Sequence, residues 1–81
     1  MILQVQKFLP EHVGKDSPVT ERTDMLDGVT RTEQREGYVK VYFGEEVTRN
    51  YSRLEDDADG IYRISTVYLL NNEGKTLRRI V

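Results

Sequence analysis

The sequence contains no cysteine and no tryptophan, and only one histidine and two prolines among its 81 residues. Without cysteine the chain can have no disulfide framework, no thiolate zinc site and no cysteine nucleophile. Its apolar runs, such as residues 67–70, are far shorter than the roughly 20 residues that a membrane span needs. Residues 1–8 also lack the basic start and small-residue cleavage site of a secretion signal. We therefore expect a cytoplasmic protein that does not insert into a membrane.

The sequence has few groups that could carry catalysis or bind a metal. His12 lies in a polar stretch with no second histidine or cysteine to complete a site. The acidic run at residues 55–60 fails as a calcium loop, because Glu55 stands at position one and Thr66 at position twelve, where aspartate and glutamate are required. We expect no enzymatic activity, no metal and no cofactor.

A chain of this length buries only about 60–65% of its unfolded surface, enough for one modest core, so we expect a single domain. The glycines fall between short segments rich in Val, Ile, Tyr and Thr, which is typical of strands separated by turns. We predict strands at residues 2–8, 38–43, 47–56, 61–70 and 75–81. The predicted fold class is mainly β, a small antiparallel meander or partly open barrel of about five to seven strands, with residues 38–81 forming a four-strand meander.

Three turns fix the predicted strand pairing. The segments 57–60 and 71–74 each combine polar residues, able to bond the backbone two places on, with a final glycine that can adopt positive φ. Gly44 at the first central position suits a two-residue type II′ hairpin. These turns set Tyr42 opposite Val47, Asp56 opposite Ile61 and Leu70 opposite Lys75.

Residues 9–36 allow two interpretations. In the first, Ser17 caps a short helix at about residues 18–27 that begins with Pro18 and ends at Gly28, which would make the fold α+β. In the second, Asp27 and Gly28 form a type I′ turn between strands at 19–26 and 29–35. The threonines at 20, 23, 30 and 32 favour the strands.

The predicted registers place all five tyrosines on one side of the sheet together with several cations. Such a face could stack bases or partner side chains, while the cations hold phosphates or carboxylates. Tyrosine is also an ordinary half-buried strand residue, so the pattern alone does not require a site. The candidate binding residues are Tyr38, Lys40, Tyr42, Arg49, Tyr51, Arg53, Tyr68 and Arg79.

Three classes of function remain. The first is a non-enzymatic module that binds another protein, or a second copy of itself, through a sheet face or edge. The second is single-stranded nucleic acid binding by the tyrosine and basic residues. The net charge of −2 and the absence of any long basic run count against the second class. The third class is an accessory subunit of an enzyme complex.

Overall fold

The computed structural model describes residues 1–10, 21–44, 47–56 and 60–81, and within these ranges it contains seven strands and no α-helix. The five strands predicted without an alternative are present; those at 2–8 and 38–43 match at both ends, and the one predicted at 47–56 ends at Tyr51. Of the two interpretations of residues 9–36, the strands are confirmed within the described ranges, at Arg22–Leu26 and at Val29–Arg35, the second with the predicted ends. The strands are β1 (Ile2–Phe8), β2 (Arg22–Leu26), β3 (Val29–Arg35), β4 (Tyr38–Phe43), β5 (Val47–Tyr51), β6 (Arg63–Leu70) and β7 (Thr76–Arg79).

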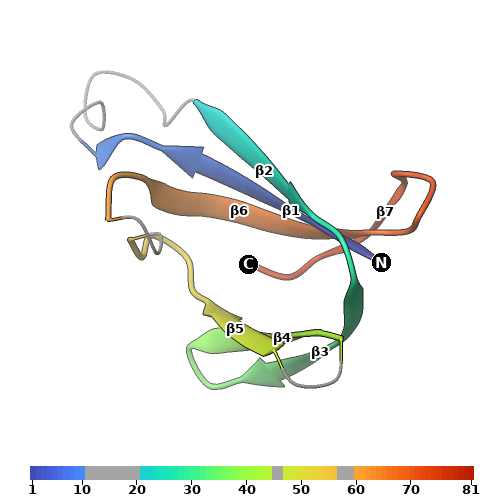
Figure 1. Ribbon diagram of the computed structural model, residues 1–81. Coiled ribbons are helices and arrows are strands. Elements are labelled where there is room, and N and C mark those ends of the chain that lie inside the picture. The colour runs from blue at the N-terminus through green and yellow to red at the C-terminus, as the bar shows by residue number, and fades with distance from the viewer. Residues whose placement is uncertain (11–20, 45–46, 57–59) are drawn as a thin grey trace.

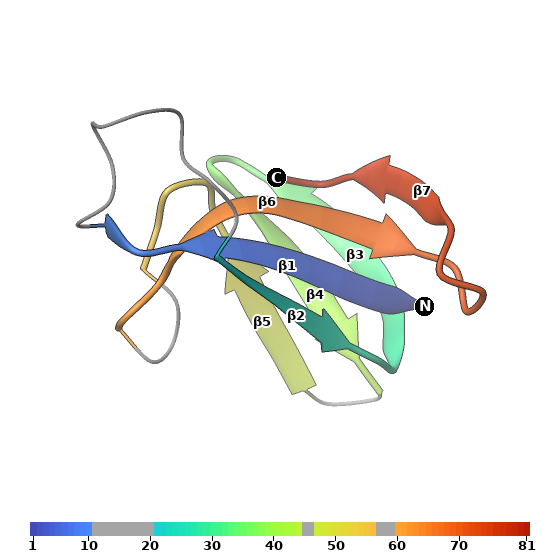
Figure 2. The ribbon, with the colours of Figure 1, turned by 90° about the horizontal axis from the view of Figure 1, so that it is seen from above.

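The strands form two antiparallel sheets that pack face to face (Figure 1). One sheet has the order β2-β1-β6-β7 and the other the order β3-β4-β5. Seen from above, the strands of one layer cross those of the other at an angle (Figure 2). The mainly β, antiparallel fold class is confirmed, and the described residues form no closed barrel.

The core lies between the two sheets and follows the two-residue period of the strands. Leu3 and Val5 of β1 are buried while Gln4 between them is not, and Val39 and Val41 of β4 alternate with half-buried neighbours. Full burial of one such side chain stabilises the fold by about 1.5–3 kcal/mol. We call the buried apolar side chains between the sheets the core cluster, and it consists of Leu3, Val5, Val29, Val39, Val41, Tyr51, Ile64, Val67 and Leu69.

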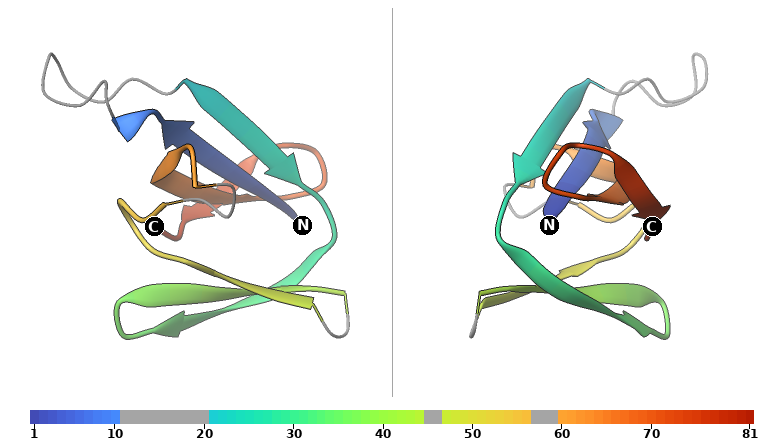
Figure 3. Two further views of the ribbon diagram at one scale, coloured as in Figure 1. Left: turned by 60° about the vertical axis from the view of Figure 1, so that its left-hand side comes forward. Right: turned by 90° about the vertical axis from the view of Figure 1, so that its right-hand side faces the viewer.

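Asp27 and Gly28 form a corner at which the chain passes from one sheet to the other (Figure 3). Gly28 has φ 84°, whereas Asp27 has no positive φ, which a type I′ turn would require. The predicted hairpin is therefore wrong: β2 pairs with β1, and β3 pairs with β4. The helical alternative is also wrong for residues 21–27, and its first three residues lie outside the described ranges.

The predicted register at Gly44 is wrong by one residue. Phe43 pairs with Val47, Val41 with Arg49, and Val39 with Tyr51. Three residues, not two, therefore separate the paired strands, and two of them, 45 and 46, lie outside the described ranges. A shift of one residue moves every side chain of β5 to the opposite face.

The predicted four-strand meander is wrong between β5 and β6. These strands belong to different sheets. The segment after β5 contacts the start of β6 through the bridge Asp56–Arg63, where the prediction paired Asp56 with Ile61, and through backbone hydrogen bonds of Ile64 with Leu54 and Glu55. The left-handed conformation of Leu54, with φ 63°, bends the chain where the prediction had a continuous strand.

The turn at residues 71–74 forms by the predicted mechanism. The Oδ1 atom of Asn71 accepts hydrogen bonds from the amides of Glu73 and Lys75, both at 2.9 Å, and Gly74 has φ 87°. The strand register beyond it differs from the prediction: Leu70 pairs with Thr76, not with Lys75. A register shift between Leu69 and Leu70 accounts for part of the difference. In the similar turn at 57–60, only Gly60 is described, with φ 74°.

Candidate binding surfaces

The structure distributes the eight predicted binding residues over five places and does not bring them onto one face. The cause is the register of β4 and β5, which places Tyr51 beside the inward-facing Val39. Tyr51 is 5% exposed and belongs to the core cluster, so its ring cannot stack on a ligand at the surface. A binding role for the other seven residues stays a prediction, but it can no longer rest on a shared face.

Tyr68 and Arg79 lie opposite each other on the outer side of the four-stranded sheet. Cross-strand pairing extends this row from Arg79 through Tyr68 to Gln4. Arg79 donates a hydrogen bond from Nε to the carbonyl of Val81 at 2.9 Å. This row faces away from the three-stranded sheet, so Tyr68 and Arg79 cannot act on one ligand together with the residues of β4.

Tyr38, Lys40 and Tyr42 do share a face, the solvent side of the three-stranded sheet. Each has a partner on β3: Tyr38 pairs with Arg35, Lys40 with Glu33, and Tyr42 with Arg31. On the other side Thr48 and Asn50 of β5 continue the rows. We call this surface the β3–β4 outer face, and it consists of Arg31, Glu33, Arg35, Tyr38, Lys40 and Tyr42.

Close contacts order the side chains of the β3–β4 outer face. The guanidinium carbon of Arg31 lies 3.8 Å from the centre of the Tyr42 ring, and the Nζ atom of Lys40 lies 5.3 Å from the same point. The carboxylate of Glu33 accepts hydrogen bonds from both Arg31 and Arg35. The single acid thus holds two cations beside the two tyrosines.

The same contacts shift the pKa values of the charged groups. The hydrogen bond from Arg31, followed by one from Tyr42, lowers the pKa of Glu33, and the hydrogen bond to Glu33 raises the pKa of Arg31. Both residues are in contact with solvent, where ion pairs are strongly screened, so these contacts orient the side chains more than they stabilise the fold.

Sequence reasoning missed Arg31, Glu33 and Arg35 as members of a surface. The sequence allows a helix or a hairpin at residues 9–36, and the hairpin pairs residues 29–35 with 19–26, so neither interpretation places these side chains beside Tyr38 and Tyr42. Their spacing of two residues does carry a signal, since in a strand it places all three on one side. The neighbouring Thr32 faces inward, paired with Val41, and accepts a hydrogen bond from Arg78 of β7.

A second surface lies at the mouth of the sandwich between the edge strands β2 and β5. A pocket of about 330 Å³ opens there, and two of its apolar side chains are largely exposed, Met25 at 52% and Val47 at 58%. Arg49, one of the predicted binding residues, lies at its rim. We call this pocket the edge groove, and it is lined by Met25, Leu26, Asp27, Phe43, Val47 and Arg49.

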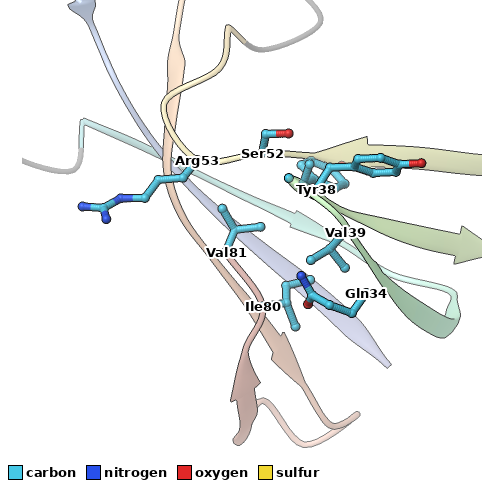
Figure 4. A pocket seen from close by; sticks show the side chains of 9 residues that line it. Gln34, Tyr38, Val39, Ser52, Arg53, Ile80 and Val81 are labelled. Atoms are coloured by element: carbon cyan, nitrogen blue, oxygen red, sulfur yellow. The ribbon is translucent and has the colours of Figure 1, made fainter.

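A smaller pocket of about 190 Å³ lies at another opening between the two sheets (Figure 4). Val39, Ile80 and Val81 form its apolar part, and Gln34 and Arg53 contribute polar groups. Figure 4 shows Arg53 directed away from the other labelled side chains. Tyr38 and Tyr51 line the same pocket, so Arg53 borders this opening together with two of the predicted tyrosines, but it does not lie in the row that Tyr38 forms with Lys40 and Tyr42.

A buried cation lies at one end of the core. Lys7 is 4% exposed, and its Nζ atom lies 2.5 Å from Oδ2 of Asp24, whose Oδ1 is 2.9 Å from Nε of Arg22. The guanidinium of Arg22 in turn lies 5.6 Å from the centre of the Tyr62 ring. The hydrogen bond from Lys7 is the main cause of a lowered pKa at Asp24. This cluster joins β1 to β2 and has the character of a structural ion pair.

Neither a metal-binding cluster nor a membrane-spanning helix occurs among the residues that the structure describes. Within them no group of three or more His, Cys, Asp or Glu side chains is placed to hold a metal ion, and no helix is long and apolar enough to cross a membrane. His12, Ser17, Pro18 and residues 57–59 of the acidic run lie outside the described ranges. The chain matches no protein-family model, no curated protein and no solved structure.

Proposed function

We propose that the protein is a small non-enzymatic binding module that takes up an extended segment of a partner protein along β5, with apolar side chains of that segment in the edge groove. The supporting observation is the combination of an open strand edge with exposed apolar side chains beside it. β5 is the last strand of its sheet, and Val47 and Met25 are more than half exposed. Exposed apolar groups beside an edge strand are a common site of strand addition.

Charge defines the kind of segment that fits. Arg49 is exposed in the middle of β5, directed to the same side as Val47. An added strand with an acidic residue opposite Arg49 and an apolar residue opposite Val47 would form favourable cross-strand pairs.

The same argument disfavours a second copy of this chain as the occupant. Antiparallel pairing of two β5 strands about a two-fold axis at their centre would place Arg49 directly opposite its own copy. Like charges in that position are destabilising. The proposal therefore commits to a partner of different sequence that carries an acidic residue opposite Arg49.

Selection from a displayed library of random peptides tests this proposal. We expect enrichment of peptides that alternate apolar and acidic residues and bind with micromolar affinity. The double variant Met25→Gln, Val47→Gln should weaken their binding about tenfold or more, because the lost apolar burial is worth at least about 1.5 kcal/mol. Leu77→Gln on β7 is the matched control, since Leu77 is equally exposed at 52% and lies outside the groove.

Two results would contradict the proposal. One is a set of enriched peptides whose affinity is the same for the groove variant and the Leu77→Gln control. The other is a concentration-dependent dimer in sedimentation that the groove variant abolishes, since that result assigns the groove to a second copy of the chain.

A further inference from the structure

We infer that the β3–β4 outer face is a second binding surface, and that its ligand is single-stranded nucleic acid. The face is independent of the edge groove, because side chains of alternate residues project from opposite sides of the sheet. Arg49 and Val47 lie on the inner side of β5, whereas Thr48 and Asn50 continue the rows of the outer face.

The spacing of the aromatic groups suits an extended strand of nucleotides. Tyr38 and Tyr42 stand four residues apart on one strand and one face, which separates them by about 13 Å. Lys40 lies between them, where a cation can contact the phosphate between two bound bases. Stacking platforms for single strands combine aromatic side chains and cations in this way.

The arginines add both charge and stacking surface. The guanidinium carbon of Arg31 lies 3.8 Å from the centre of the Tyr42 ring, and a guanidinium plane can itself stack on a base. Arg35 occupies the corresponding position beside Tyr38. A single acid, Glu33, orients both arginines and leaves the face with more positive than negative charge. The local field thus has the sign that attracts phosphates although the chain as a whole carries −2.

The rings of Tyr38 and Tyr42 lie on the side of β4 that does not pack against the core. β4 contributes its buried side through Val39 and Val41, which are 2% and 0% exposed, whereas Tyr38 and Tyr42 on the other side remain half-buried. An acidic peptide would use the cations of this face but not the planar surfaces. The two paired arginine–tyrosine rows therefore favour nucleic acid as the ligand. Binding of an acidic peptide in its place is one of the results that the experiment below can distinguish.

Fluorescence anisotropy with a labelled single strand of about 12 nucleotides tests the inference, since one small β domain covers about 4–16 nucleotides. We expect micromolar binding at about 50 mM salt that weakens strongly by about 200 mM. Tyr38→Ala should weaken binding about fivefold or more, and Tyr38→Phe, which keeps the stacking surface, should restore it. Glu33→Gln should tighten binding, because it removes the only negative charge of the face.

The chain provides a matched control for these variants. Tyr68 and Arg79 are the same residue types, paired across two strands on the outer side of the other sheet. Tyr68→Ala and Arg79→Gln should leave the affinity unchanged, and so should the edge-groove variant. The two proposals therefore fail independently of each other.

Three results would overturn the inference. The first is the absence of salt-dependent binding to any single strand. The second is an equal loss of affinity in Tyr38→Ala and Tyr68→Ala. The third is binding to a glutamate-rich peptide, with no binding to the oligonucleotide, that Lys40→Gln abolishes, since this result assigns the face to an acidic protein.

Discussion

Each of the four tyrosines that lie in strands has the surroundings that its strand position gives it. Tyr38 and Tyr42 fall on the solvent side of β4, Tyr51 falls on the core side of β5, and Tyr68 falls on the solvent side of the other sheet. A common preference of tyrosine for strands therefore placed these residues in three different environments. The tyrosine content therefore indicated a β fold, but it did not indicate which tyrosines share a binding surface.

At the residue scale, the buried Lys7–Asp24 ion pair allows a prediction about the stability of the protein. Asp24→Asn should destabilise the protein by about 1–3 kcal/mol in urea unfolding at neutral pH, because it removes the carboxylate charge that the nearly buried Lys7 cation contacts. Asp56→Asn is the control, since the pair of Asp56 with Arg63 is exposed on both sides and should contribute under about 1 kcal/mol. Equal effects of the two variants would contradict a structural role for Lys7.

The lowered pKa of Asp24 also fixes the sign of a pH dependence. A carboxyl whose pKa is lower in the folded state adds stability above its ordinary pKa of about 3.9, and that contribution is lost as the pH falls through the folded value. The stability difference between the wild type and Asp24→Asn should therefore be constant near neutral pH and shrink below about pH 4. A difference that grew on acidification, measured by urea titrations at several pH values, would contradict the assignment.

At the scale of elements, the sequence specified the strands better than their partners. Residues 2–8 and 38–43 were predicted with the observed ends because alternation and glycine boundaries are local signals. The pairing of β2 with β1 and of β6 with β1 depends on which apolar faces meet across long stretches of chain, and no local signal carries that information. For the same reason the sequence could name Tyr38, Lys40 and Tyr42 but not the arginines beside them.

The bend after β5 supplies a prediction for an element boundary. Leu54 adopts φ 63° and is 55% exposed, so its side chain adds little burial while its backbone carries a cost of about 1–2 kcal/mol. Leu54→Gly should raise the free energy of unfolding by up to about 1 kcal/mol, whereas Leu77→Gly, a similarly exposed leucine within β7, should lower it. Chemical denaturation of both variants tests the bend, and destabilisation by Leu54→Gly would contradict it.

At the scale of the whole molecule, both sheets contribute to one core, so they should unfold together. Leu3 of β1 and Val41 of β4 are both fully buried in that core. Leu3→Ala should cost about 2–5 kcal/mol and Val41→Ala about 2 kcal/mol, and each should lower a single unfolding transition. Transitions that differ between tyrosine fluorescence and circular dichroism would show two independent units.

The two layers also explain how an 81-residue chain can present two unlike surfaces. Alternate side chains of the three-stranded sheet point to opposite sides. Those on one side pack on the core and line the edge groove, and those on the other side form the β3–β4 outer face. Both assignments depend on the register between β4 and β5, which is the central claim of this account.

Cross-strand nuclear Overhauser effects between β4 and β5 test that register most directly. The account predicts contacts that place Val41 opposite Arg49 and Val39 opposite Tyr51. Contacts that instead place Val41 opposite Thr48 would return Tyr51 to the side of Tyr38 and Tyr42, and would contradict both the buried Tyr51 and the two surfaces derived from it.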